Sequence, residues 1–92
     1  MASRIALASL YNLTGKSDQA VSLLKQAVDK NKNNLIPQEY LLMQVAESYE
    51  KAGKKKEATE QWQKILNQYK DSPLSYQAQM RLNELKRSEN SQ

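Results

Sequence analysis

Few residues in this sequence could carry out chemistry on their own. The chain has 92 residues, with no Cys and no His. It therefore lacks thiolate nucleophiles, the commonest general base and the commonest transition-metal ligands. Its carboxylates offer only pairs three residues apart, Glu47 with Glu50 and Glu57 with Glu60, and such pairs are equally typical of a solvated helix surface. With only two glycines, the chain has no Gly-rich phosphate loop. We therefore expect no enzymatic activity, no metal site and no cofactor.

Three consecutive lysines, Lys54, Lys55 and Lys56, form the most basic run. They could contact phosphate groups or an acidic protein, but without aromatic platforms such binding is weak and salt-sensitive. We interpret the run as a solvated turn. The net charge of +4 adds only a mild attraction to anions, so nucleic acid is disfavoured as a partner. Tyr11 and Trp62 lie at helical spacings among apolar residues, which predicts core packing rather than a stacking cage.

The elements that must position any site are helices. The chain is rich in strong helix formers, and its 39% hydrophobic content is enough for a core. Its mean hydropathy is −0.84, and no apolar run approaches the ~18 residues of a membrane span. Apolar residues recur at intervals of three and four in five segments. The predicted helices cover residues 2–14, 17–31, 37–52, 56–69 and 73–87.

Residues that favour the ends of helices separate these segments. Gly15 and Gly53 can adopt the left-handed conformation that ends a helix. Ser17 is expected to cap the second helix, and Pro37 suits the first position of the third. In the same way, Ser72-Pro73 predicts a cap followed by the first residue of the last helix.

The first two segments repeat in the next two with a shift of 38 residues. Tyr11 aligns with Tyr49, and Gly15 with Gly53. The other matched pairs are Leu7 with Val45, Ala8 with Ala46, Lys16 with Lys54, Ala20 with Ala58, Leu24 with Trp62, and Val28 with Leu66. Two helix-turn-helix units followed by a final helix predict an all-α helical solenoid.

These positions carry a resemblance to the tetratricopeptide repeat (TPR) family over about residues 4–85. The signature positions of the family hold Leu7, Ala8, Tyr11, Gly15, Ala20, Leu24 and Ala27 in the first unit, and Leu42, Val45, Ala46, Tyr49, Gly53, Ala58, Trp62 and Ile65 in the second. The resemblance implies a right-handed α-solenoid of two hairpins and a capping helix. The unit spacing departs from the usual ~34 residues, with four extra residues in the 32–36 connection. Asn83 and Lys86 stand where a third unit would have Ala and Tyr, so the last helix is either a cap or a cut third repeat.

We expect a single domain over residues 1–88, with units 2–31 and 37–69, a last helix at 73–87 and a disordered tail at 89–92. The junction Tyr69–Pro73, followed by Ala78, is similar to repeat junctions of bacterial cell-envelope TPR proteins. That similarity implies a periplasmic rather than cytoplasmic domain, whose parent protein is held at the membrane by a segment that this chain lacks.

The TPR resemblance implies that a peptide or protein segment binds the concave face formed by the first helix of each unit. The matched residues on that face are Ile5, Ser9, Asn12, Tyr40, Met43, Gln44, Glu47, Gln77, Met80 and Arg81. We expect contact to centre on Tyr40, Met43 and Glu47. A clamp for a chaperone's carboxylate tail is disfavoured, because Ile5 and Met43 cannot donate a hydrogen bond and Glu47 would repel the carboxylate. The expected function is a non-catalytic adaptor or scaffold, and the alternative is a self-association module that forms a homodimer.

Overall fold

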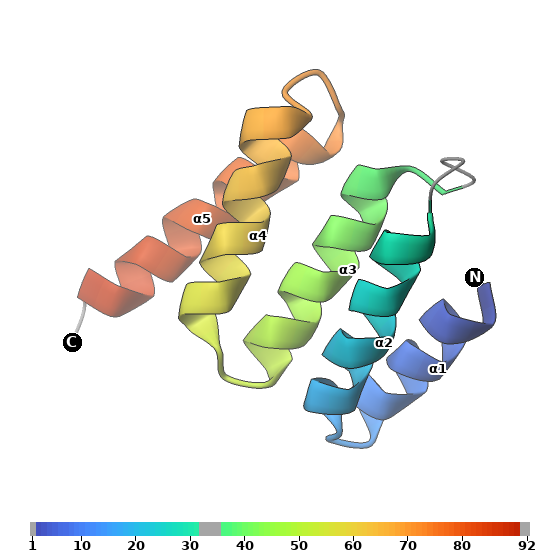
Figure 1. The fold of residues 1–92 in the computed structure, drawn as a ribbon. Helices are drawn as coiled ribbons and strands as arrows, with labels where there is room; N and C mark the ends of the chain where they lie inside the picture. Colours follow the sequence, from blue (N-terminus) through green and yellow to red (C-terminus); the bar gives the residue numbers. More distant parts are fainter. Residues whose placement is uncertain (1, 32–35, 91–92) are drawn as a thin grey trace.

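The computed structural model describes residues 2–31 and 36–90, and every regular element within them is an α-helix. The five helices are α1 (Ala2–Leu13), α2 (Ser17–Lys30), α3 (Gln38–Lys51), α4 (Lys55–Gln68) and α5 (Leu74–Asn90). Each helix packs against the next and runs antiparallel to it (Figure 1). The predicted all-α helical repeat is therefore confirmed. No helix in the described ranges is long and apolar enough to cross a membrane.

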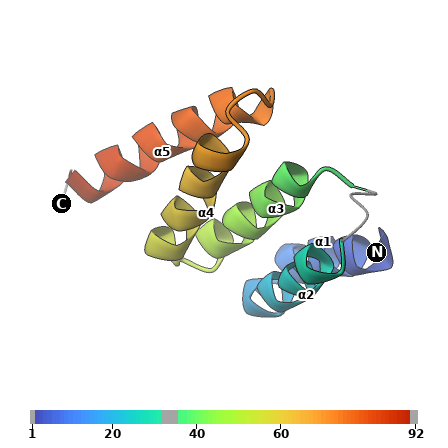
Figure 2. The ribbon, with the colours of Figure 1, turned by 45° about the horizontal axis from the view of Figure 1, so that its top comes forward.

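The helices form two layers. Helices α1, α3 and α5 lie on one side, where α3 also contacts α5, while α2 and α4 form the other layer. Between Cα atoms the molecule measures 38 × 33 × 16 Å. The shortest dimension corresponds to two helices packed with their axes ~8–10 Å apart. Figure 2 shows the hairpins as successive steps, with the N-terminus at one end of the molecule and the C-terminus at the other. The first helices of the units thus share one surface.

Two glycine turns fix the direction of each hairpin. Gly15 and Gly53 have φ angles of 79° and 78°, in the left-handed region. In the first turn, the N–H of Lys16 donates to the carbonyl of Tyr11 at 2.7 Å. In the second, the N–H of Lys54 donates to the carbonyl of Tyr49 at 2.8 Å. The same helix-ending motif therefore recurs 38 residues apart, because a β-carbon at either glycine would strain the backbone.

The core follows the predicted pairing of small and large side chains. Ala8, Ala20, Ala46 and Ala58 are all buried, which lets paired helices approach closely. The largest fully buried side chain is Trp62. Its counterpart Leu24 is also fully buried, as the 38-residue repeat predicts. Burying a side chain of this size stabilises the fold by ~1.5–3 kcal/mol.

Several predicted helix ends shift by one or more residues. Ser17 is the first residue of α2 and is buried, so the prediction that it caps the helix is wrong. Lys16 takes the cap position because its carbonyl already accepts the N–H of Ala20 at 3.2 Å. Pro37 likewise lies just before α3, with ψ of 128°. The hydroxyl oxygen Oγ of Ser72 accepts the N–H of Leu74 at 3.2 Å, as expected of a capping residue. Helix α5 begins at Leu74, one residue after the predicted start at Pro73.

The C-terminal helix is longer than predicted. It continues to Asn90, three residues beyond the expected end at Arg87. Residues 89 and 90, expected in a disordered tail, are therefore helical, because no glycine or proline interrupts the chain there. The last two residues of that tail and residues 32–35 of the connection lie outside the described residues. At the edge of this connection, the amide of buried Asn31 donates to the carbonyl of Ile36 at 2.7 Å.

Candidate functional site

The first-helix surface carries two hollows that join in the middle of α3. The hollow between α1 and α3 is about 240 Å³, and the hollow between α3 and α5 is about 520 Å³. The first is lined by Ser9, Asn12, Leu13, Gln44, Glu47 and Lys51. The second is lined by Glu47, Glu50, Lys51, Gln77 and Arg81. We call the two together the inner groove. Glu47 and Lys51 line both hollows and form its centre.

Helical spacing explains why these residues share a surface. On α3, Gln44, Glu47 and Lys51 are separated by three and four residues, which places them on one helix face. On α1, Ser9 and Asn12 are three residues apart, so they also share a helix face. Six of the ten predicted site residues line the inner groove: Ser9, Asn12, Gln44, Glu47, Gln77 and Arg81.

The remaining four predicted site residues lie elsewhere. Met43 is only 9% exposed and packs in the core, so little of its side chain is open to a partner. That contact centres on Tyr40, Met43 and Glu47 stays a prediction. Ile5 is partly buried and packs against the same core. Tyr40 and Met80 are exposed but line neither hollow. The apolar contacts predicted for the groove are thus mostly absent, and the lining is largely polar.

Sequence reasoning missed two lining residues, Leu13 and Lys51. Lys51 lies four residues after Glu47, so its place on the same helix face could have been read from the spacing. Leu13 ends α1, and its side chain is strongly exposed. It supplies the main apolar surface at that end of the groove.

At the α1–α3 end, the groove is held by one polar contact. Asn12 donates from Nδ2 to the hydroxyl of Ser48 at 2.9 Å. Ser48 is fully buried, so this hydrogen bond ties α1 to α3 at the floor of the hollow. The side-chain amide oxygen Oδ1 of Asn12 is buried as well, and no group among the described residues donates a hydrogen bond to it. Asn12 therefore acts first as a structural link between the units.

The carboxyl of Glu47 occupies a half-buried position at the centre of the groove. Burial raises its pKa above the ordinary value, and the positive charges of Arg81 and Lys51 partly offset that increase. A carboxylate that has lost part of its hydration gains from any cation brought by a partner. Glu47 is therefore the residue in the groove best placed to recognise a basic group.

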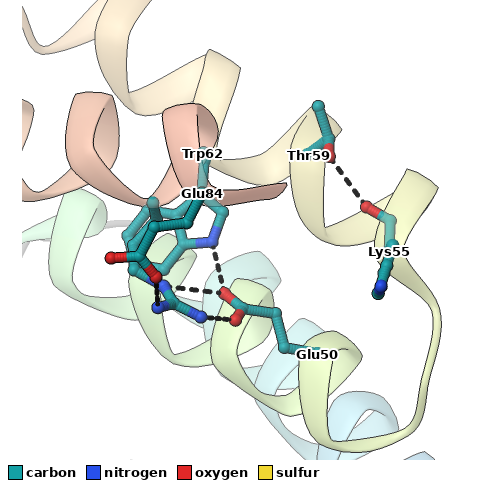
Figure 3. Close-up of polar contacts among 6 residues, drawn as sticks. Glu50, Lys55, Thr59, Trp62 and Glu84 are labelled. Carbon is teal, nitrogen blue, oxygen red and sulfur yellow. Dashed lines mark hydrogen bonds and ion pairs between the residues drawn. The ribbon is translucent and has the colours of Figure 1, made fainter. Parts of the chain in front are cut away.

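The α3–α5 end is held by a charged network (Figure 3). Glu50 on α3 accepts a hydrogen bond from the indole Nε1 of Trp62 at 2.7 Å. The guanidinium of Arg81 on α5 binds both carboxylate oxygens of Glu50 and also donates to Glu84. Because the indole is buried, it needs this acceptor. Arg81 thus already pairs with two carboxylates of its own chain.

The lysine run lies away from the groove, at the turn that begins α4. All three lysines are exposed. The ammonium of Lys54 lies 3.2 Å from the carboxylate of Asp18, and this hydrogen bond together with the charge raises the lysine pKa. The structure agrees with the interpretation of the run as a solvated turn. The pairing of Lys54 with Asp18 also links the two glycine turns of neighbouring units.

The groove is lined by groups that can form hydrogen bonds and ion pairs. The described residues contain no cluster of three or more acidic side chains that could hold a metal ion. The lining consists of three amides, one hydroxyl, two carboxylates, two cations and the apolar side chain of Leu13. Such a mixed lining suits hydrogen bonding to a peptide and charge-specific contacts to its side chains.

Comparison with known proteins identifies the repeat. A family model described as tetratricopeptide repeat matches residues 4–34 and 40–72, which correspond to the two hairpins. Helix α5 lies beyond the second match. Neither a search of curated proteins nor a search of solved structures found a match. Since the two matched segments cover more than half of the sequence and coincide with the two helical hairpins, the chain belongs to the tetratricopeptide repeat family.

Proposed function

We propose that this chain is a protein-binding scaffold domain that holds a peptide or protein segment in the inner groove. Tetratricopeptide repeats generally mediate protein–protein interaction, and the fold is typically non-catalytic. The observation that carries the proposal is that the two hollows meet at Glu47 and Lys51. A bound segment can therefore contact α1, α3 and α5 at once.

The charges in the groove favour a particular kind of segment. Arg81 is engaged by Glu50 and Glu84, so its charge is largely compensated within the domain. Glu47 has no such bidentate partner among the described residues, and its burial disfavours its charged form. A Lys or Arg side chain of the partner placed over Glu47 would relieve that cost. We therefore propose that the bound segment carries a basic residue near its centre.

Peptide selection tests this proposal. Displayed peptides of random sequence are selected on the parent domain, and the best binder is titrated against variants. Glu47→Lys, in the centre of the groove, is expected to weaken binding at least tenfold and to change the selected peptides from basic to acidic. Matched controls are Gln26→Lys on α2 and Lys64→Glu on α4, two exposed positions outside the inner groove. Binding that survives Glu47→Lys but is lost in either control would place the site on the second-helix layer and contradict the proposal.

A bacterial cell-envelope parent protein, with this domain in the periplasm, is also part of the proposal. It rests on the residues of the Tyr69–Pro73 junction and on no other observation. Fractionation of cells that express the full-length gene product tests it, with recovery in the cytoplasmic fraction as the contradicting result.

A further inference from the structure

A third hollow lies beside the two glycine turns, which Figure 1 shows at the same end of the molecule. We call it the turn hollow. It measures about 460 Å³ and is lined by Asn12, Gly15, Ser17, Asp18, Lys51 and Ala52. Asn12 also lines the α1–α3 hollow, and Lys51 lines both hollows of the inner groove. The turn hollow therefore adjoins the inner groove.

The buried hydroxyl of Ser17 has no role in the repeat itself. Ser17 is only 6% exposed, whereas Lys55, at the equivalent position of the second unit, is exposed. No described residue forms a hydrogen bond with the Ser17 hydroxyl, and it is still not among the unpartnered side-chain atoms that are closed off from solvent. The hydroxyl therefore meets solvent, and it does so in the turn hollow that Ser17 lines. It is free to bind a group that enters there.

The start of α2 adds backbone donors to this hydroxyl. Lys16 occupies the cap position without a side-chain hydrogen bond to the helix. The first N–H of α2 with a backbone acceptor is that of Ala20, which donates to the carbonyl of Lys16. The N–H groups of Ser17, Asp18 and Gln19 therefore have no acceptor among the described residues. These donors and the partial positive charge of a helix start favour a negatively charged ligand.

The charged side chains of the turn hollow also favour an anion. Asp18 is the one acidic residue in its lining, and the ammonium of Lys54 lies 3.2 Å from the Asp18 carboxylate. Lys51 forms no salt bridge with a described residue. A cation would meet a neutralised carboxylate, an ammonium group and a positive helix end. An anion would meet the ammonium of Lys51, the Ser17 hydroxyl and the N–H groups of α2.

We propose that the turn hollow binds the carboxylate of an aspartate or glutamate in the segment that the inner groove holds. This inference rests on the proposed function, because the segment must lie in the groove for its side chain to reach the hollow. The carboxylate accepts hydrogen bonds from the Ser17 hydroxyl and the first N–H groups of α2, and it pairs with Lys51. Glu47 and Lys51 are one helical turn apart, ~6 Å along α3. In an extended segment this span places the acidic residue ~2–4 positions from the basic one.

Titration of the complete chain with small anions tests the turn hollow without a partner segment. The probes are sodium acetate and, separately, inorganic phosphate, with the ionic strength held constant by sodium chloride. Acetate should produce saturable shifts of the amide signals of Ser17, Asp18 and Gln19. Ser17→Ala and Lys51→Gln should each weaken acetate binding at least ~threefold. The matched control Lys64→Gln removes the same charge from an exposed position outside the hollow and should leave the affinity unchanged.

Three results of this titration would overturn the inference. The first is the absence of saturable shifts at the start of α2. The second is an equal loss of affinity in Lys51→Gln and Lys64→Gln, because the effect would then be one of overall charge. The third is saturation by phosphate without saturation by acetate, because the ligand would then be free phosphate rather than a carboxylate.

Peptide selection then tests whether the bound segment supplies the carboxylate. Peptides selected on the parent domain should carry an acidic residue ~2–4 positions from the basic residue that Glu47 favours. Ser17→Ala combined with Lys51→Gln should remove the acidic preference and keep the basic one. Peptides that keep the basic residue but show no acidic preference would overturn this inference and leave the proposed function standing. Peptides with neither preference would contradict the proposed function itself.

Discussion

Removal of the Glu50 carboxylate should weaken the contact between α3 and α5 more than any other single surface change. In the structure, this carboxylate accepts the indole hydrogen bond of buried Trp62 and pairs with the guanidinium of Arg81. Its own side chain is only 15% exposed. Glu50→Ala therefore leaves a buried N–H donor without its acceptor and an arginine without its main partner.

The size of the effect follows from these two losses. An unsatisfied buried donor costs ~1–3 kcal/mol. The lost pairing with Arg81, which is about one-third exposed, adds at most ~1 kcal/mol because water screens it. We expect the free energy of unfolding to fall by ~2–3 kcal/mol for Glu50→Ala. Glu50→Gln should cost less, because its amide oxygen can still accept from Trp62.

Urea unfolding followed by tryptophan fluorescence measures this directly, because Trp62 is the single tryptophan of the chain. The matched control is Glu60→Ala, an exposed glutamate on α4, which should change the free energy of unfolding by less than ~0.5 kcal/mol. If Glu50→Ala and Glu60→Ala have equal effects, the network does not hold the last helix and the reasoning fails.

Three further predictions address packing, surface charge and pH. Ala46→Trp or Ala20→Trp should lower the free energy of unfolding by ~1–3 kcal/mol or more, since both alanines are fully buried where helices approach closely. An unchanged thermal midpoint in both variants would contradict this close approach of the paired helices. Changing the lysine run 54–56 to glutamine should leave the circular dichroism spectrum of the folded domain intact and reduce only weak binding to polyanions, whereas loss of the fold would show that the run is structural. Burial raises the pKa of Glu47 in the folded state above its pKa in the unfolded chain. The ionised carboxylate therefore destabilises the fold at pH values above the folded-state pKa, and this cost is absent at pH values below the unfolded-state pKa. Glu47→Gln should therefore raise the melting temperature at pH 7 but not at pH 3, and an equal gain at both would argue against burial as the cause.

The fold could be predicted largely from the repeat itself. The 38-residue shift pairs Gly15 with Gly53 and Leu24 with Trp62, and each pair has the same conformation or burial in the structure. A repeated position meets the same neighbours in each unit, so the pattern of residue size is enough to locate the core. Helix ends were less predictable, because the turn hydrogen bond of Lys16 decides where α2 starts.

The candidate site was only partly predictable. Helical spacing correctly brings Gln44 and Glu47 to one face, but it does not give the rotation of one helix against its neighbour. That rotation turns Met43 into the core and leaves Tyr40 outside both hollows. The pairing of Arg81 with Glu50 joins residues 31 positions apart, on helices whose approach depends on the burial of Trp62. No local pattern in the sequence indicates such a contact.

Amide chemical-shift mapping of a selected peptide tests the central claim most directly. The claim is that the inner groove, centred on Glu47, holds the partner segment. Titration of the labelled domain should produce its largest shifts at Gln44, Glu47 and Lys51, with smaller ones on α1 and α5, and Glu47→Lys should remove them. Shifts confined to α2 and α4, for example at Lys25 and Lys64, would show that the partner binds the other layer and would contradict the account.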